Sequence, residues 1–280
     1  MTDSGTLFVV ATPLGHLGDL SQRAVEILRV VPVVAAEDTR HSRQLLTHIG
    51  ASPLLLSFHA HSDPGRVERL LGILAEGRDV ALVSDAGTPG ISDPGAVLVR
   101  AVREAGIRVV PIPGPSAVAT ALSASGLPAD RFLFLGFLPR KGPERERLLR
   151  QVADSEWTVV LYEAPHRLAD LLGDLAAAAG SDRQAVVGRE LTKLHEEFRA
   201  GALSDLLAYW TGVEVRGECT VVVEGRGHTE PDVADQADAG RALAAVLLAE
   251  GHSRKDVVRR LTEQLQLPRN LAYRLVMERS

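Results

Sequence analysis

Short apolar runs alternate with amphipathic stretches along the first half of the chain. Apolar residues at helical spacing predict helices over 24–31, 66–76 and 96–105. Gly77 and Gly106 follow the last two of these helices, at positions that favour a left-handed residue. The runs, which are typical of buried strands, cover 7–11, 33–36, 54–58, 80–83 and 108–112. Because strands and helices alternate, we predict a mostly parallel sheet covered by helices on both faces.

The periodic pattern is interrupted at 125–128 (SGLP), where Gly and Pro punctuate the chain. A polar stretch at 225–235 is typical of a linker, and Ser253 followed by Asp256 indicates a helix start. Between these points we predict strands over 132–137, 158–162, 185–187 and 219–224, and helices over 144–152, 167–178 and 203–209. Three short predicted helices end the chain, over 237–250, 253–264 and 269–277. Helices this short, joined by tight turns, favour a small helix-turn-helix-like unit.

These breaks divide the chain into three predicted parts. We expect an α/β domain over 1–127, a second α/β domain over 128–228, and a linker with a basic helical domain over 229–280. A length of 280 residues is consistent with this division, since a domain usually holds about 100–200 residues.

Composition restricts the class of protein and its location. With 45% hydrophobic residues the chain can bury ordinary cores, so overall disorder is excluded. One Cys can form neither an intrachain disulfide nor a multi-thiolate zinc site, which fits a reducing cytosol. The first residues lack the pattern of a signal peptide, and no apolar run approaches the ~18 residues of a membrane span. We therefore expect a cytoplasmic protein that has no membrane partner.

Charge is distributed unevenly along the sequence. The chain carries a formal charge of −5, but from residue 240 onward eight Lys/Arg stand against four Asp/Glu, which leaves −9 for the rest. A basic tail on an acidic body suggests a polyanionic partner. Judged by charge alone, a helix face exposed to solvent is an equally good explanation.

Three loops after predicted strands are rich in Gly, Pro and small polar residues, at 12–15, 84–95 and 111–117. Ligands of doubly wound sheets lie beyond the carboxyl ends of the strands, so these loops are the candidate binding site. In the long middle loop we expect Asp85 to Thr88 to contact a ligand. We expect Asp93 to cap the helix that follows it.

Several common motifs are absent from the sequence. It holds no Walker A loop, no G-x-G-x-x-G after the first strand and no G-x-S-x-G elbow, which argues against an NTPase, an ordinary dinucleotide enzyme and an α/β-hydrolase. His59 and His61 form a weak metal pattern without a third ligand, so we expect no metal site.

Seven segments together carry a family resemblance. The three loops read ATPLG at 11–15, DAGTPGISDPG at 85–95 and PGPSA at 113–117; further segments read EDTR at 37–40, GFLPRK at 136–141, YEAPHR at 162–167 and RELTK at 189–193. In this order they resemble the tetrapyrrole-methylase superfamily of S-adenosylmethionine-dependent methyltransferases. The last four narrow the resemblance to members that methylate ribose in small-subunit ribosomal RNA.

The resemblance implies a fold and a cofactor site. The fold would have two α/β domains with S-adenosyl-L-methionine in the cleft between them, as a homodimer. The residues implied to bind the cofactor are Pro13, Asp85, Gly87, Thr88, Ile91, Ser116, Ala117, Tyr162 and Leu191. Many members have Gly-Gly-Asp-Pro where this chain has Asp-Ala-Gly-Thr-Pro, so Thr88 and main chain would replace the carboxylate contact.

The resemblance also implies a reaction, transfer of a methyl group to the 2′-hydroxyl of a cytidine in 16S ribosomal RNA. A weakly acidic hydroxyl benefits from a positioned base, and the candidates are Glu37, Asp38, His59, Glu163 and Glu190. The candidate phosphate-binding residues are Arg40, Arg140, Lys141, Arg167, Arg189 and Lys193, together with Arg254, Lys255, Arg259 and Arg260 in the tail. Several of these acidic and basic residues could instead form structural ion pairs, such as Glu37 with Arg40.

Two other functions remain open from the sequence. One is a methyltransferase that acts on a tetrapyrrole, although such an enzyme does not need the basic tail. The other is a non-catalytic RNA-binding assembly factor, which does not need the Gly- and Pro-rich cofactor loops.

Overall fold

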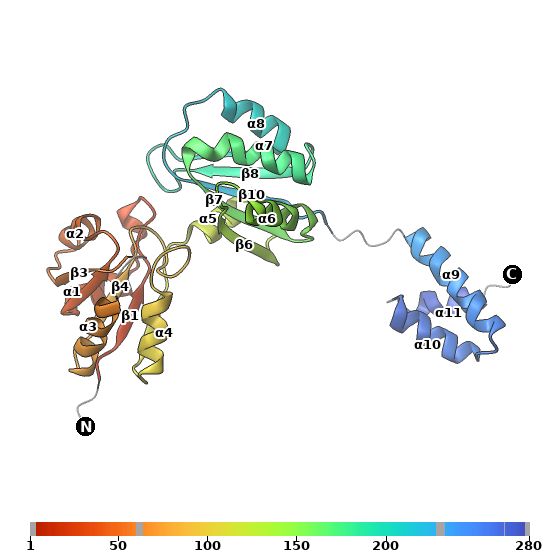
Figure 1. Ribbon diagram of the computed structural model, residues 1–280, viewed down its shortest axis with the longest axis horizontal. Helices are drawn as coiled ribbons and strands as arrows, with labels where there is room; N and C mark the ends of the chain where they lie inside the picture. Colours follow the sequence, from red (N-terminus) through yellow and green to blue (C-terminus); the bar gives the residue numbers. More distant parts are fainter. Residues whose placement is uncertain (1–3, 60–63, 228–232, 266, 278–280) are drawn as a thin grey trace. The chain divides into compact units, whose positions relative to one another are not determined.

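The computed structural model describes residues 4–59, 64–227, 233–265 and 267–277 (Figure 1). The chain forms two compact units, Met1–Arg226 and Gly227–Ser280. The larger unit contains two five-stranded sheets, and the smaller unit is helical. No helix among the described residues is long and apolar enough to cross a membrane.

The first sheet is parallel throughout and has the strand order β3-β2-β4-β1-β5. Its strands are β1 (Leu7–Val10), β2 (Val33–Ala36), β3 (Leu54–Ser57), β4 (Val80–Val83) and β5 (Val109–Ile112). The helices in this part of the chain are α1 (Gln22–Val30), α2 (Thr39–His48), α3 (Pro64–Ala75), α4 (Ala96–Glu104) and α5 (Ala117–Ser125). All five strands predicted from the apolar runs are confirmed, and so is the parallel sheet.

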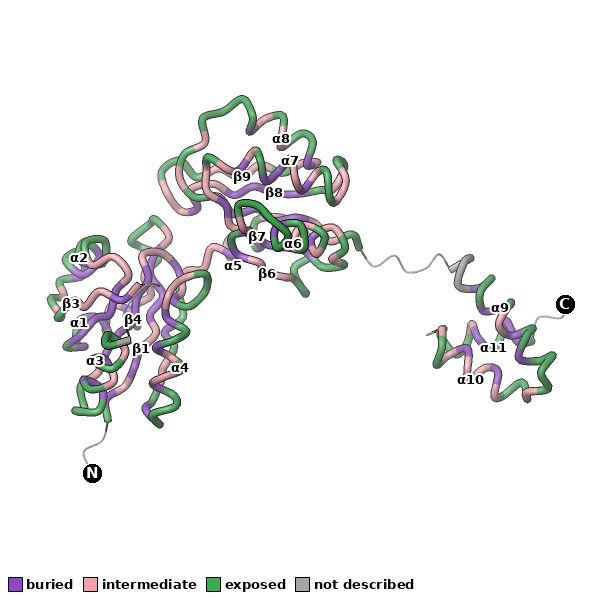
Figure 2. The backbone as a smooth tube through the Cα atoms, viewed as in Figure 1, coloured by how far each residue is buried: buried purple, intermediate pink, exposed green. Residues whose placement is uncertain are grey.

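Both faces of this sheet are covered, as predicted. Alternate residues of β2 enter different cores: Val33 and Ala35 pack with α3 and α4, whereas Val34 and Ala36 pack with α1 and α2. Because both faces are buried, the strands consist of continuous apolar residues rather than alternating ones. Figure 2 shows the buried residues on the strands and on the inner sides of the helices.

The second sheet is mixed and has the order β6-β7-β10-β8-β9. Only β6 and β7 pair in parallel; the other neighbours are antiparallel. The strands are β6 (Phe132–Phe137), β7 (Thr158–Glu163), β8 (Gln184–Arg189), β9 (Glu197–Ala202) and β10 (Cys219–Val223). The helices are α6 (Pro143–Asp154), α7 (Leu168–Ala179) and α8 (Leu203–Thr211).

Helices α6, α7 and α8 cover one face of the second sheet around the buried Trp210. Helix α5 supplies Val118, Ala121 and Leu122 to the other face, against Val160 and Val222. The helix that follows the last strand of the first sheet therefore packs on the second sheet.

The sequence pattern missed α2, α5 and β9. Helix α2 is mostly polar and buries only Ser42, Leu45 and Leu46, so its apolar periodicity is weak. Helix α5 is built from Ala, Ser, Thr, Val and Leu and lacks a charged face, because one side of it is an interior surface. Strand β9 reads EFRAGA and has no buried residue, so it contains no continuous apolar run.

The smaller unit consists of α9 (Val233–Ala249), α10 (Arg254–Gln264) and α11 (Arg269–Met277). Ser253 caps α10 by accepting a hydrogen bond from the Asp256 N–H at 3.2 Å, as predicted. All three helices contribute to one small core around Val257 and Leu261. Helix α9 begins four residues before the predicted start, inside the stretch that we expected to be linker. The exact domain boundaries stay predictions.

Candidate cofactor and RNA sites

Three loops meet at the carboxyl edge of the first sheet because β1 lies between β4 and β5. The Thr12 N–H donates to the Gly87 carbonyl at 2.8 Å, and the Gly87 N–H donates back to Thr12 at 3.0 Å. The Thr88 hydroxyl donates to the Pro115 carbonyl at 3.1 Å. The loops after β1, β4 and β5 are thus joined where ligands of such sheets bind.

Gly87 is required by the geometry of this junction. Its φ of +84° lies in the left-handed region, and a Cβ there would stand 3.4 Å from Leu14 Cδ2. A side chain would find room there, in ordinary contact with Leu14, but would strain the backbone at this φ. The predicted role of this glycine in holding the loop close to a ligand is consistent with that conformation.

A cavity of about 320 Å³ opens above these loops. Ligand pockets usually measure about 300–1,000 Å³, so this cavity fits a small molecule. Its lining comes from both α/β parts of the larger unit. The lining residues are Leu14, Ala86, Gly87, Thr88, Ile91, Ser92, Asp93, Ser116, Ala117, Phe137, Tyr162, Glu163, Ala164, Pro165, Glu218, Cys219 and Thr220.

Six of the nine residues predicted to bind the cofactor line this cavity: Gly87, Thr88, Ile91, Ser116, Ala117 and Tyr162. The other three lie outside its lining. Pro13 is buried, Leu191 belongs to the apolar core with Val118, and the Asp85 carboxylate accepts the Asp38 N–H at 2.9 Å. Asp85 therefore fixes the loop after β2 to the loop after β4.

Asp93 lies in the cavity lining, and the prediction that it caps α4 is wrong. The N-cap of α4 is Gly95, which has no side-chain cap. Burial is the main cause that raises the pKa of Asp93 to about 6. A hydrogen bond with Ser84 lowers this pKa, and repulsion from Asp85 and Glu218 raises it further. The sequence feature that could have indicated this position is that Asp93 is a second carboxylate in the loop already expected to bind a ligand.

Glu163 is a second carboxylate at the cavity and has almost no exposed surface. Its Oε1 accepts the Ala164 N–H at 2.8 Å, and Oε2 lies 3.3 Å from the Arg167 guanidinium. Within the described residues, no donor makes a hydrogen bond of good geometry to Oε2. Burial, partly offset by Arg167 and Arg145, raises the pKa of Glu163.

Aromatic rings form one wall of the cavity. Tyr162 packs edge-on against Phe134, with ring centroids 4.9 Å apart, and lies 5.5 Å from the ring of Phe137. Phe137 keeps 56% of its surface exposed. Burial, and then the charge of Asp93, raise the pKa of Tyr162 to about 12, so its hydroxyl stays protonated. This wall offers apolar contact to a flat ring.

Two of the base candidates, Asp38 and Glu190, are held in ion pairs. Asp38 caps α2, and hydrogen bonds from Arg40 lower its pKa to about 2. Burial would raise the pKa of Glu190, but hydrogen bonds from Lys193 and the Glu218 N–H outweigh it and lower that pKa. Both are therefore weak bases held in ion pairs.

The remaining candidates lie outside the cavity lining. Burial and the charges of Asp93 and Asp85 raise the pKa of Glu37. His59 follows β3 and is half-buried. His61 lies outside the described residues. Among those residues, no group of three or more His, Cys, Asp or Glu side chains could hold a metal ion.

Two loops of the larger unit contact each other beside the cavity. The His16 N–H donates to Thr192 Oγ1 at 3.2 Å, and a Cβ at Gly15 would overlap Lys193. Glu190 and Thr192 have φ values of +52° and +64°, conformations that non-glycine residues rarely adopt. Strain of this kind concentrates at functional sites, which favours a role for the segment 189–193.

The predicted phosphate-binding residues fall into several groups. Arg140 and Arg167 lie together around a shallow pocket with Arg145, which pairs with Asp174 at 2.6 Å and which the sequence reasoning missed. Lys141 is exposed. Arg40 pairs with Asp38, Arg189 with Glu197, and Lys193 with Glu190 and Glu218.

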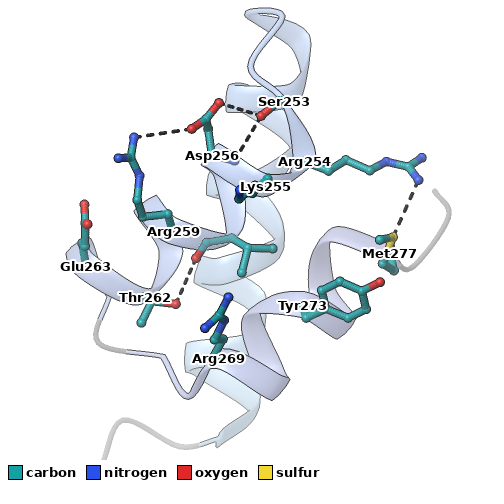
Figure 3. Close-up of a pocket in the computed structure, with 11 residues that line it drawn as sticks. Ser253, Arg254, Lys255, Asp256, Arg259, Thr262, Glu263, Arg269, Tyr273 and Met277 are labelled. Atoms are coloured by element: carbon teal, nitrogen blue, oxygen red, sulfur yellow. Dashed lines mark hydrogen bonds and ion pairs between the residues drawn. The ribbon is translucent and has the colours of Figure 1, made fainter.

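The tail residues are divided by the fold. Arg254, Lys255 and Arg259 line a groove between α10 and α11 (Figure 3), whereas Arg260 is half-buried outside its lining. The opposite face of α10 is apolar: Val257 and Leu261 are buried, with Val258 and Leu265 packed against them.

The larger unit has two α/β parts whose residues line one cavity at the ends of the strands. Residues 6–207 match the family Tetrapyrrole (Corrin/Porphyrin) Methylases. The chain belongs to this family. It is 46% identical over 274 residues to the ribosomal RNA small subunit methyltransferase I of Synechocystis sp., covering 98% of both chains. It is 50% identical to the protein of that name from Xylella fastidiosa, covering 88% of this chain and 90% of that one.

Solved structures share the fold at lower identity. A cobalt precorrin-4 methyltransferase matches with a TM-score of 0.61 and 19% identity, over 78% of this chain and 94% of that chain. The uroporphyrin-III C-methyltransferase of Thermus thermophilus, complexed with S-adenosylhomocysteine, matches with a TM-score of 0.57 and 19% identity, over 79% and 97%. These likenesses support the two-sheet α/β architecture.

Proposed function

We propose that this protein is an S-adenosylmethionine-dependent methyltransferase that acts on the ribose 2′-hydroxyl of a cytidine in 16S ribosomal RNA. The single observation that carries the proposal is the alignment with the Synechocystis relative, which spans 98% of both chains at 46% identity. The segments 37–40, 136–141, 162–167 and 189–193, which narrow the resemblance to ribose methylation, all lie within the larger unit.

The cavity suits S-adenosylmethionine, which carries a sulfonium and an ammonium. Three carboxylates line it, from Asp93, Glu163 and Glu218, and no Lys or Arg stands among the described lining residues. Glu163 Oε2 is buried and ion-paired with Arg167, but it accepts no hydrogen bond of good geometry from the described residues, so an N–H group of the cofactor would supply one. Gly87 and Ala86 offer main-chain groups, and Tyr162 with Phe137 offers aromatic surface.

When bound, the cofactor supplies a methyl carbon that its sulfonium makes electrophilic, without a metal. The loops contribute by holding the hydroxyl in line with that carbon, since fixed geometry alone can account for several orders of magnitude in rate. Asp93 is the base that we favour. Its carboxylate lies in the cavity, where burial raises its pKa to about 6, and it would accept the hydroxyl proton as the methyl group passes from the sulfonium sulfur to the ribose oxygen.

RNA would be held by contacts between its phosphates and cations of both units. In the larger unit Arg40, Arg140 and Lys141 are exposed. Arg167, Arg189 and Lys193 are half-buried in ion pairs, which they would have to share with phosphates. Deleting residues 235–280 should weaken RNA binding and its salt dependence and leave cofactor binding intact. Unchanged methylation kinetics on ribosomal subunits after this deletion would contradict a role for the tail.

A tetrapyrrole substrate is the second candidate and has weaker support. The solved enzymes with tetrapyrrole substrates in their names are only 19–24% identical to this chain, which supports the fold alone. The relatives at 46–50% identity are named for ribosomal RNA. A non-catalytic assembly factor would not need the glycine-dependent junction of Thr12 with Gly87.

Transfer of a labelled methyl group tests the proposal. Labelled S-adenosylmethionine is incubated with the protein and either small ribosomal subunits, free 16S RNA or uroporphyrinogen. We expect label in RNA, recovered after nuclease digestion as 2′-O-methylcytidine. Label in uroporphyrinogen would favour the tetrapyrrole enzyme. Cofactor binding without transfer to any substrate, or no binding by calorimetry, would contradict the proposal.

Three further expectations accompany this function and stay predictions. They are a homodimer, a cytoplasmic location and the domain boundaries at 127/128 and 228/229. Light scattering of the purified chain tests the first, cell fractionation the second, and limited proteolysis the third.

A further inference from the structure

A groove of about 920 Å³ runs between α10 and α11 in the helical unit (Figure 3). It is separate from the cavity described above and lies wholly within this unit. Helix α10 contributes Ser253, Arg254, Lys255, Asp256, Val258, Arg259, Thr262 and Glu263, and α11 contributes Arg269, Tyr273 and Met277.

The groove is more basic than the unit that carries it. Residues 227–280 contain eight Lys/Arg and eight Asp/Glu, so their formal charge is zero. The groove lining holds four cations, from Arg254, Lys255, Arg259 and Arg269, but only two carboxylates, from Asp256 and Glu263. An excess of positive charge on one surface of a neutral unit favours an anionic partner there.

Tyr273 is the second feature of the groove. It keeps 55% of its surface exposed, whereas its neighbours Ala272, Leu275 and Val276 form the buried side of α11. With Arg269 and Met277 it forms a stripe at four-residue spacing, which places all three on one side of the helix. Tyr273 is therefore an open aromatic surface outside the core.

Figure 3 shows Arg254, Lys255 and Arg269 on the two helices that form the groove, and Arg259 farther from Tyr273, beside Asp256. Lys255 and Arg269 come from facing helices, and Arg254 reaches across so that its Nη1 lies 3.6 Å from the Met277 sulfur. Arg259 is tied to Asp256 at 3.5 Å along the outer side of α10. Lys255 and Arg269 make no ion pair with any residue that the structure describes, and both are exposed, so they can meet phosphates.

We propose that this groove binds single-stranded RNA, with one base stacked on Tyr273 and the flanking phosphates held by Lys255, Arg269 and Arg254. Single strands are the polyanions whose flat rings are accessible, since a duplex hides its rings inside the stack. An acidic peptide would match the charge but would leave the exposed ring unexplained. The choice of RNA over DNA rests on the proposed function.

The test measures binding of a fluorescein-labelled, cytidine- and uridine-containing 12-mer to the full chain by anisotropy at several salt concentrations. Tyr273→Ala should weaken affinity about tenfold without changing the salt slope, because stacking displaces no counterions. Tyr273→Phe should keep the affinity. Arg269→Ala should lower the slope by about 0.7, the value for one phosphate contact on a single strand.

Arg274→Ala is the matched control, since this residue is exposed on the same helix and lies outside the groove lining. It removes the same charge, and we expect it to change affinity and slope much less than Arg269→Ala. Circular dichroism confirms that each variant keeps its helices.

The outcomes separate this inference from the proposed function. If the chain methylates 16S RNA but binds the 12-mer equally well with and without Tyr273, or does not bind it measurably, the groove proposal is wrong. Equal losses for Arg269→Ala and Arg274→Ala would show a diffuse charge effect and also overturn it. If a duplex or an acidic peptide competes better than the single strand, the occupant is not a single strand.

Discussion

The cavity of the larger unit and the groove of the helical unit are built in opposite ways. The cavity gathers residues from Leu14 to Thr220 through two sheets, and its ionisable lining is acidic. The groove is made by two consecutive helices, from Ser253 to Met277, and its lining is mostly basic. One surface suits a small cation and the other a polyanion.

This difference suggests a division of labour between binding and chemistry. The cavity depends on strained turns and long-range strand order, so small changes there should act on catalysis or on the cofactor. The groove depends on a helix pair with its own core, so changes there should act on RNA affinity. Variants that change catalysis and RNA affinity equally would contradict this separation.

The largest effect is expected from Asp93→Asn. The amide cannot accept the hydroxyl proton, so the methyl-transfer rate should fall about 10²–10⁴-fold. Single-turnover kinetics measure the rate, and calorimetry measures cofactor affinity in the same variant. A role as base predicts a lower rate with an unchanged dissociation constant.

Asp154→Asn, at the exposed end of α6, is the control and should keep full activity. If Asp93→Asn weakens cofactor binding and leaves the rate of the bound complex unchanged, Asp93 balances the charge of the cofactor instead. RNA affinity should stay constant in either case.

The pH dependence of the methyl-transfer rate is a second test of Asp93 as the base. The pKa of Asp93 is about 6, raised by burial, and Glu37, Asp85 and Glu218 are the neighbouring carboxylates in its field. The deprotonated form accepts the proton, so activity should be constant above about pH 7 and fall about tenfold per unit below pH 6. The residual activity of Asp93→Asn should lack this acidic limb; if the limb persists, another group titrates.

Leu261→Ala tests whether the two units act independently. Leu261 is fully buried in the small core of the helical unit, and such a truncation costs about 2–5 kcal/mol. A unit of this size has little stability to spare, so its helices should unfold and RNA affinity should fall with them. Circular dichroism measures the loss. Exposed Gln264→Ala should be silent, and a change in cofactor affinity would contradict independence.

Gly87→Ala should have the smallest of these effects. An alanine at a φ of +84° costs about 1–2 kcal/mol, which we expect to appear as roughly tenfold weaker cofactor binding. Calorimetry checks this value. Gly72→Ala is the control, because Gly72 lies inside α3 with open space at its Cβ, where alanine should add up to about 1 kcal/mol of stability. Equal affinities for the two variants would contradict the role of Gly87.

Much of the fold was determined locally and could be predicted from the sequence. Continuous apolar runs identified every strand of the first sheet, and the inner strands β2 and β4 need apolar residues at each position because both of their faces are buried. The start of α10 at Ser253 followed from its capping pattern alone. The Gly- and Pro-rich loops located the cofactor cavity, since few other structures need so many turn residues after strands.

Only the tertiary structure decided which side chains of those loops face the cavity. Asp93 and Asp85 are eight residues apart in one loop, yet one lines the cavity and the other bonds to the Asp38 N–H. The ion pair of Glu190 with Lys193 is local, three residues apart, but the hydrogen bond from the Glu218 N–H to Glu190 forms only because the chain returns beside it just before β10. Local sequence determines backbone conformation, whereas burial, charge and partners of an ionisable group depend on neighbours that are distant along the chain.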